Sequence, residues 1–220
     1  MQKIKRIIKI GGSIFTDKNL NVVIEPTDAN FNQFFNSEQL QSKFELLKKL
    51  NYLDEGSVIV FGAGLYGHGL AKLHGLSADK FVTVDESVVK KINQNLKLLF
   101  DELLKPVLDK FVTRDAKVVL PKLIHKVDNA KLVRICSGDE IVADLAKDFE
   151  PKKLIYCSDV PGVKLKDSWI AKFAVSELPR ILNEMENFVE VRTDATGEMK
   201  NKLKKILDIQ PNSDLTIEFI

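Results

Sequence analysis

The chain has 220 residues, of which 45% are hydrophobic and 29% are charged, as is typical of a globular protein that buries a substantial core. Its 33 basic and 31 acidic residues nearly cancel, so we expect no nucleic-acid or membrane partner. No apolar run approaches the roughly 20 residues of a membrane span, and the N-terminus lacks the apolar core of a signal peptide, so we expect a cytoplasmic protein.

The first predicted strand covers residues 4–10 and runs directly into a glycine turn, Gly11-Gly12-Ser13. Lys9 stands at the end of this strand, and Lys18 lies just beyond the turn. Glycine lets a backbone approach a ligand closely, and lysine supplies positive charge, so the pattern favours a phosphate-binding turn. A hairpin turn flanked by solvated lysines is the alternative that this stretch leaves open.

A second glycine turn, residues 62–68, follows an apolar strand at 58–61. It is not a Walker P-loop, because His68 stands where that motif needs lysine. Its glycines do fit the G-x-G-x-x-G fingerprint of dinucleotide-binding proteins, with a strand-like run at 81–84 and Asp85 beyond it. A third interpretation is a turn that binds a substrate phosphate, in which His68 takes part in the chemistry.

The rest of the chain alternates between helical and strand-like patterns. Periodicity and capping residues predict helices near 37–50, 69–73, 85–106, 141–146, 176–185 and 200–207, and apolar runs predict strands at 117–120, 132–136, 153–157, 189–192 and 215–220. Pro106 should end or kink the longest helix, and Cys136 and Cys157 should be reduced core residues. This alternation predicts an α/β fold, an open αβα sandwich with a mainly parallel central sheet, in one domain over residues 1–220. The turns should then converge on one edge of the sheet.

Phosphate-type turns recur at strand ends along nearly the whole chain. They are Lys9-Ile10-Gly11-Gly12-Ser13, Lys18, the turn at 62–68, and the stretches at 136–141, 158–163 and 194–202. In this order they resemble the motifs of the amino acid kinase family. Within that family, the glycine turn that ends in histidine is most similar to the isopentenyl phosphate kinase branch and its fosfomycin-kinase relatives.

The resemblance implies a kinase that transfers the γ-phosphoryl group of ATP, carried with Mg²⁺, to a small-molecule phosphate acceptor such as isopentenyl phosphate. It also implies a homodimer, because family members commonly form one. The residues implied in phosphoryl transfer are Lys9, Lys18, His68, Asp139 and Lys202. Those implied in nucleotide binding are Gly11, Gly12, Ser13, Asp159, Gly162, Thr196, Gly197, Met199 and Lys200. Those implied in acceptor binding are Gly62, Ala63, Gly64, Gly67, His68 and Gly138.

The chemistry of phosphoryl transfer suggests a role for two of these residues. Asp139 has no evident task as a base if the acceptor is already an ionised phosphate, so we expect it to orient the lysines; capping the helix that follows is its alternative role. His68 is better suited to donate a hydrogen bond to such an acceptor than to remove a proton, and otherwise it is only the first residue of a helix. His74 and His125 are expected on the surface. With no cluster of His and Cys, no metal site made by the protein is expected.

The chain also departs from the family pattern. Ala63 and Leu65 replace a glycine and a serine of the glycine turn, Pro161 replaces an aspartate, and Asn201 replaces a glycine. The segment 121–137 is much shorter than in relatives, where it helps to wall the acceptor pocket. These differences bear on which acceptor is used more than on phosphoryl transfer itself.

Three other functions remain open from the sequence. The same fold could phosphorylate a different small phosphate, a phosphonate or an amino-acid-like acceptor. Residues 62–67 could instead bind NAD(P) in a Rossmann-type protein, which would leave the motifs at 9–13 and 194–202 unexplained. The chain could also bind a ligand without catalysis, but the retention of Lys9, Lys18, Asp139 and Lys202 argues against this.

Overall fold

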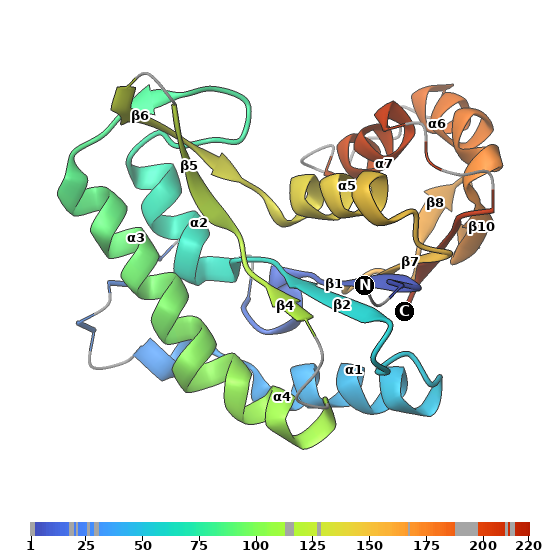
Figure 1. The fold of residues 1–220 in the computed structure, drawn as a ribbon, viewed down its shortest axis with the longest axis horizontal. Helices are drawn as coiled ribbons and strands as arrows, with labels where there is room; N and C mark the ends of the chain where they lie inside the picture. Colours follow the sequence, from blue (N-terminus) through green and yellow to red (C-terminus); the bar gives the residue numbers. More distant parts are fainter. Residues whose placement is uncertain are drawn as a thin grey trace.

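A computed structural model describes residues 3–17, 20, 22–25, 27–28, 31–112, 117–126, 129–166, 168–187, 198–209, 211 and 214–220 (Figure 1). Its centre is a six-stranded sheet in the order β10-β11-β7-β1-β2-β4. These strands are β1 (Arg6–Ile10), β2 (Ser57–Phe61), β4 (Lys117–Val119), β7 (Lys153–Cys157), β10 (Lys172–Ala174) and β11 (Thr216–Phe219). Neighbouring strands are parallel except β10 and β11. The predicted α/β fold with a mainly parallel sheet is confirmed.

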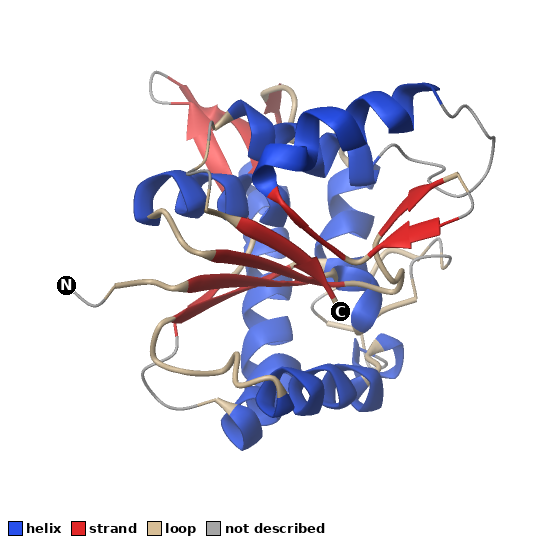
Figure 2. Cartoon of the chain, turned by 90° about the vertical axis from the view of Figure 1, so that its right-hand side faces the viewer, coloured by secondary structure: helices blue, strands red, loops and turns tan. Residues whose placement is uncertain are grey.

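Helices cover both faces of this sheet (Figures 1 and 2). On one face lie α1 (Ser37–Lys49) and α4 (Lys105–Phe111), and on the other lie α5 (Gly138–Phe149), α6 (Leu178–Asn187) and α7 (Glu198–Asp208). Ile8 belongs to the core under α1, whereas its neighbour Ile7 belongs to the core under α5. Because both faces of the strands are covered, their sequences read as nearly continuous apolar runs.

A smaller sheet is formed by β3 (Val82–Thr83), β5 (Lys122–Lys126) and β6 (Asn129–Cys136). The predicted strand at 132–136 therefore belongs to a β5–β6 hairpin rather than to the central sheet. The run at 81–84 contains β3, which pairs antiparallel with β6 and not with β2. The βαβ unit that a dinucleotide fingerprint requires is thus not built from these strands. A two-stranded ribbon, β8 (Val163–Leu165) and β9 (Ser168–Ile170), completes the described strands.

Of the two effects predicted for Pro106, ending or kinking the long helix, the first is wrong. The helix α3 (Glu86–Leu98) passes through one wide π-type turn, Leu99–Leu104, and continues as α4. The backbone N–H of Lys105 bonds to the carbonyl of Phe100, five residues back. Proline has no N–H to donate, and it stands within the first two positions of α4, where the loss of that donor is tolerated.

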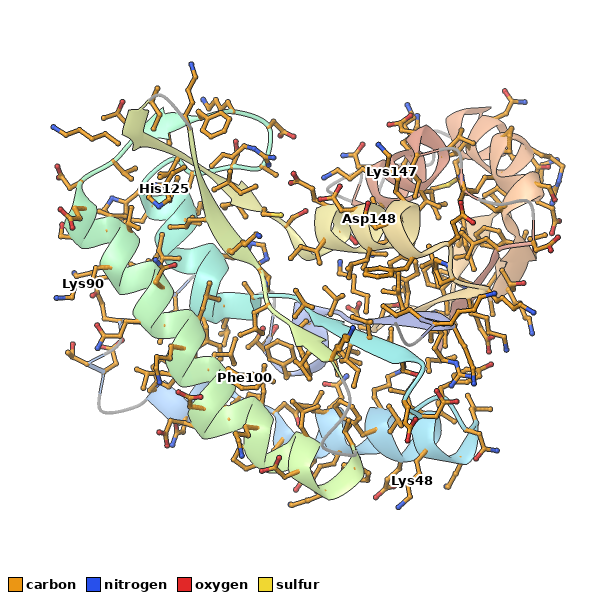
Figure 3. All side chains as sticks on the ribbon, viewed as in Figure 1. Lys48, Lys90, Phe100, His125, Lys147 and Asp148 are labelled. Carbon is orange, nitrogen blue, oxygen red and sulfur yellow. The ribbon has the colours of Figure 1, made fainter. Side chains whose placement is uncertain are left out.

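The outer surface carries the charge that composition predicts. Lys48, Lys90, Lys147 and Asp148 are exposed on the helices, and His125 is exposed on β5, as expected (Figure 3). Among the described residues, no helix is both long and apolar enough to cross a membrane. The strand predicted at 189–192 lies outside the described residues.

Candidate active site

Three parallel strands end at one edge of the central sheet. Ile10, the last residue of β1, is in register with Phe61 of β2 and Cys157 of β7. The ladder extends into the turns, since the N–H of Gly11 bonds to the carbonyl of Cys157 and that of Gly62 bonds to the carbonyl of Ile10. The turns after these strands therefore emerge side by side, as the sequence predicts.

The two glycine turns are in direct backbone contact. A Cβ on Gly12 would lie 2.6 Å from the Cα and N of Gly64, and a Cβ on Gly62 would lie 2.7 Å from the N of Gly12. Thr16 joins the turns as well, because its hydroxyl donates to the carbonyl of Gly12 at 2.8 Å and accepts from the N–H of Leu65 at 3.3 Å. Glycine is thus required at positions 12 and 62, because any side chain there would clash with the backbone of the other turn.

Gly12→Ala is expected to destabilise the chain by about 1–3 kcal/mol, because the added methyl group must push two backbone turns apart. Urea denaturation of the variant beside wild type measures this cost. Gly56→Ala is the matched control, since its Cβ would meet mainly the flexible side chain of Lys5, at 3.0 Å. Equal losses at the two positions would show that the contact between the turns is not tight.

A charged centre lies above this edge, on the face covered by α5. The Nζ of Lys9 is 2.5 Å from the Oδ1 of Asp139 at the start of α5. The charge of Lys202, on α7, also acts on this carboxylate. Burial alone would raise the pKa of Asp139, but Lys9 and Lys202 outweigh it and hold this pKa below its usual value. The structure therefore brings together three of the predicted catalytic residues, with the positive charges of Lys9 and Lys202 acting on the ionised carboxylate of Asp139.

The start of α5 explains how Asp139 reaches the lysine. Ser137 is the N-cap, and its hydroxyl accepts the N–H of Glu140, so the alternative role of Asp139 as the cap is wrong. Asp139 lies one residue further along, inside the first turn. Gly138 permits the close packing, because a Cβ there would lie 3.1 Å from the carbonyl oxygen of Phe61 and 3.3 Å from the Cε of Lys9.

His68 lies in α2 (Gly64–Leu73), which begins at Gly64 and not at residue 69 as predicted. The side chain is exposed and lines a hollow of about 340 Å³. The other lining residues are Ala71, Lys72, Gly75, Leu76 and Ile135. Because α2 starts earlier, His68 lies one turn inside the helix and is not beside the terminal amides. Leu65 is buried in the core, so its side chain does not line this hollow.

Ser13 and Asp159 meet across the ends of β1 and β7, with the Ser13 hydroxyl 3.1 Å from Oδ1 of Asp159. Both line a groove of about 640 Å³ that also includes Thr16, Asp17 and the N-terminus of α1. The groove therefore presents hydroxyl and carboxylate oxygens, and its lining shares no residue with the hollow beside His68.

The hairpin sheet is tied to α5 by Arg134 of β6. Its guanidinium donates two hydrogen bonds to the carboxylate of Glu140, at 2.8 and 2.6 Å. This forked contact holds the pKa of Glu140 below its usual value. The guanidinium also lies over the ring of Phe81, 5.7 Å from its centroid. Since Glu140 follows Asp139, the contact links the hairpin to the turn that carries the charged centre.

The other predicted residues are distributed as follows. Gly162 has φ +152°, and a Cβ there would lie 2.3 Å from the carbonyl oxygen of Ile170, so a tight turn explains this glycine. Ala63 is buried before α2, and Met199 and Lys200 are half-buried in the first turn of α7. Lys18, Thr196 and Gly197 lie outside the described residues.

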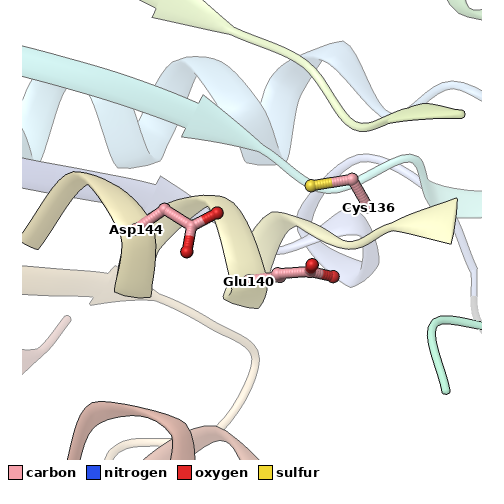
Figure 4. Close-up of side chains that lie close together, drawn as sticks. All are labelled: Cys136, Glu140 and Asp144. Carbon is pink, nitrogen blue, oxygen red and sulfur yellow. The ribbon is translucent and has the colours of Figure 1, made fainter. Parts of the chain in front are cut away.

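One side-chain cluster could suggest a metal. Donor atoms of Cys136, Glu140 and Asp144 lie within 4.8 Å of one another (Figure 4). However, Glu140 is already engaged by Arg134, and burial raises the pKa of the Cys136 thiol, which disfavours the thiolate that a metal needs. The cluster supports no metal assignment.

Two contributors to the site were not predicted. Thr16 and Tyr156 are both buried, at 3% and 2% exposure, and the Nζ of Lys202 lies 5.1 Å from the centroid of the Tyr156 ring. Thr16 follows the first glycine turn closely, so a polar residue at this position was a signal that could have been used. Tyr156 stands in an apolar strand and offers no such signal.

Comparison with known proteins decides the family. The sequence pattern of the amino acid kinase family matches residues 93–220, more than half of the chain. This chain belongs to the amino acid kinase family. It is a kinase, and as such it uses ATP and acts on a small molecule.

Two curated relatives are similar over most of the chain. The isopentenyl phosphate kinase of Methanocaldococcus jannaschii is 25% identical over 243 residues, covering 91% of this chain and 85% of the relative. That of Thermoplasma acidophilum is 24% identical over 234 residues, covering 93% and 86%.

Solved structures of such enzymes share the fold. An isopentenyl phosphate kinase substrate complex has a TM-score of 0.64 at 16% identity, covering 99% of this chain and 90% of that one. The T. acidophilum isopentenyl phosphate kinase product complex has a TM-score of 0.60 at 18% identity, covering 98% and 90%.

Proposed function

We propose that this kinase transfers the γ-phosphoryl group of Mg-ATP to a phosphate monoester, and that isopentenyl phosphate is its acceptor. The observation that carries the choice of acceptor is the similarity, over 91% and 93% of this chain, to two relatives named for that activity. The exposed His68 beside a hollow supports it, because this is the residue that separates the isopentenyl phosphate kinase motif from that of other family members.

In this proposal the charged centre, which consists of Lys9, Asp139 and Lys202, neutralises the negative charge of the phosphoryl group during its transfer. Phosphoryl transfer depends on holding two anionic reactants in line and on offsetting the charge that spreads over the phosphoryl oxygens. Lys9 and Lys202 supply positive charge from two different elements, and Lys18 adds a third cation from the loop after the first glycine turn. Asp139 holds the first two in place, as a positioning residue that does not touch the substrate.

The nucleotide is assigned to the Ser13 side. The turn Gly11-Gly12-Ser13 would cradle its phosphates with the amides of Gly12 and Ser13, since the N–H of Gly11 is already bonded to the carbonyl of Cys157. Asp159, Gly162, Met199 and Lys200, with Thr196 and Gly197, would complete the site. Hydroxyl and carboxylate oxygens are donors that suit Mg²⁺, so Ser13 and Asp159 fit the ion that ATP carries. Bound there, Mg²⁺ would neutralise charge on the β- and γ-phosphates.

The acceptor is assigned to the His68 side. Gly62, Ala63, Gly64, Gly67 and Gly138 would line it, and His68 would donate a hydrogen bond to the phosphate that accepts the phosphoryl group. That phosphate already carries its nucleophilic oxygen, so no general base is required. By the same similarity to the family, we propose that residues 1–220 act as one domain and assemble as a homodimer.

The hollow beside His68 also favours a second acceptor class, which the experiment includes. Its lining combines the apolar Ala71, Leu76 and Ile135 with the exposed Lys72, and the hairpin at 121–137 is short. A small phosphate or phosphonate with a more polar tail would suit such a lining.

The experiment is a panel of acceptors with Mg-ATP, read by product mass and ADP formation. The panel contains isopentenyl phosphate, dimethylallyl phosphate, a short polar phosphate monoester and fosfomycin, with a reaction lacking acceptor as the background. The proposal predicts isopentenyl diphosphate as the product with the highest kcat/KM. Phosphorylation of another member without any diphosphate from isopentenyl phosphate would overturn the choice of acceptor and leave the kinase assignment intact.

A further inference from the structure

Tyr156 occupies an unusual position for a core residue. It lies in the middle of the central sheet on β7, and only 2% of it is exposed. Its hydroxyl makes no hydrogen bond to any residue that the structure describes. Leaving a buried hydroxyl unpaired is costly, and phenylalanine would fill the same space without that cost. The hydroxyl therefore adds no stabilising contact that the structure shows, and the contacts that distinguish this side chain are those of its ring.

Tyr156 lies next to the charged centre of Lys9, Asp139 and Lys202. The strand register places it beside Lys9 of β1, and adjacent residues in register share a face of the sheet. Its ring stacks on that of Phe219, with centroids 5.3 Å apart, and the ammonium of Lys202 lies over it at 5.1 Å from the centroid. Burial raises the pKa of Tyr156 far above its usual value, and the nearby charge of Asp139 raises it further, so the phenol is neutral.

We propose that Tyr156 is a positioning residue whose ring holds the Lys202 ammonium beside Asp139, ready for the phosphoryl group. The inference rests on the proposed roles of Lys9, Lys202 and Asp139. A lysine side chain has many rotamers, and an aromatic face restricts them by attracting the cation. Unlike a second carboxylate, the ring has no net charge, so the positive charge of Lys202 remains available to phosphoryl oxygens.

The test is a double-mutant cycle between Tyr156→Leu and Lys202→Met, using the best acceptor of the panel. Tyr156→Leu is expected to lower kcat about tenfold, the range of a partly desolvated cation–π contact. In the Lys202→Met background the same substitution should change kcat by less than about twofold, because the group it positions is gone. Tyr156→Phe keeps the aromatic face and should stay within about threefold of wild type.

Leu154→Ala is the control for damage to the core. Leu154 lies on the same strand and face, with 1% exposure, and its substitution should lower stability yet act independently of Lys202→Met on kcat. If Tyr156→Leu is also independent of Lys202→Met, or if Tyr156→Phe loses as much activity as Tyr156→Leu, the proposal is overturned.

A second readout does not depend on catalysis. Protons on the Lys202 side chain above the ring should show an upfield ring-current shift in NMR spectra, assigned by comparison with Lys202→Met. The shift should persist in Tyr156→Phe and vanish in Tyr156→Leu. Its absence from wild type would overturn the positioning role even if the kinase activity is found. Its presence in a protein that does not phosphorylate isopentenyl phosphate would refute the acceptor alone.

Discussion

Lys9→Ala is expected to lower kcat by about 10²–10³-fold, the loss that follows removal of one preorganised electrostatic donor. Lys9 is the penultimate residue of β1, just before the first glycine turn, and its side chain is only 11% exposed, so bulk water replaces its charge poorly. The variant also removes the lysine that is hydrogen-bonded to Asp139 and leaves this carboxylate with the charges of Lys202 and Lys205, which should cost about 1–3 kcal/mol of stability. Steady-state kinetics and urea denaturation of the same preparation measure the two effects.

Lys5→Ala is the matched control, because Lys5 is an exposed lysine just before the opposite end of β1. It should change kcat by less than about twofold. Lys9→Gln, which keeps most of the side-chain stem, separates loss of charge from loss of packing. Unchanged turnover in a folded Lys9→Gln protein would remove Lys9 from the mechanism.

Asp139→Asn is expected to lower kcat about 10²-fold with little change in KM for either substrate. The carboxylate holds Lys9 at 2.5 Å, and a neutral amide would let the ammonium groups of Lys9 and Lys202 repel each other out of place. Misplacement by about 1 Å is enough for a loss of that size. Because Asp139 does not touch the substrate, the effect should fall on kcat, which initial-rate kinetics at saturating ATP will show.

The stability of Asp139→Asn should depend on pH in a defined direction. The folded pKa of Asp139 is lowered from its usual 3.8, so the carboxylate stabilises the fold above that pH and ceases to do so as the pH falls through the folded pKa. The deficit in unfolding free energy relative to wild type should therefore shrink below about pH 4. Asp144→Asn, an exposed carboxylate on the same helix, should show no such trend. A deficit that is constant from neutral pH to pH 3 would contradict the ion pair.

The strands that form the centre of the fold could be predicted because each is buried on both faces. β1, β2 and β7 read as short apolar runs that end in glycine or polar turns, which is typical of a parallel sheet. The β5–β6 hairpin could not be recognised in the same way, since β5 mixes Lys122, His125 and Lys126 with apolar residues and is half exposed. The start of α2 was placed late because glycine is a poor helix former, and here tertiary contact with the first turn overrides propensity.

In the candidate site, too, some contacts could be predicted from the sequence and others could not. The sequence motifs assign Lys9 and Asp139 to one site, but the route by which they meet differs from the prediction, because β6, which precedes Asp139, belongs to the hairpin sheet and not to the central sheet. The contact between Lys202 and Tyr156 could not be predicted, because an aromatic residue in an apolar strand looks like any core residue until the packing of α7 places a particular lysine over its ring. The link between Arg134 and Glu140 depends on how the hairpin leans toward α5, which the local sequence does not encode.

The most direct test of a site divided between donor and acceptor is to titrate both ligands into His68→Ala and Ser13→Ala. The two side chains line two hollows that have no lining residue in common, so each variant is the control for the other. Calorimetry with Mg-ADP and with isopentenyl phosphate gives four affinities to compare with wild type. His68→Ala should weaken the acceptor by at least tenfold, as expected for loss of a charge-assisted hydrogen bond, and leave the nucleotide within about twofold. Ser13→Ala should show the reverse pattern. Loss of nucleotide binding in His68→Ala with acceptor binding intact would contradict the proposed division and make residues 62–68 a nucleotide turn.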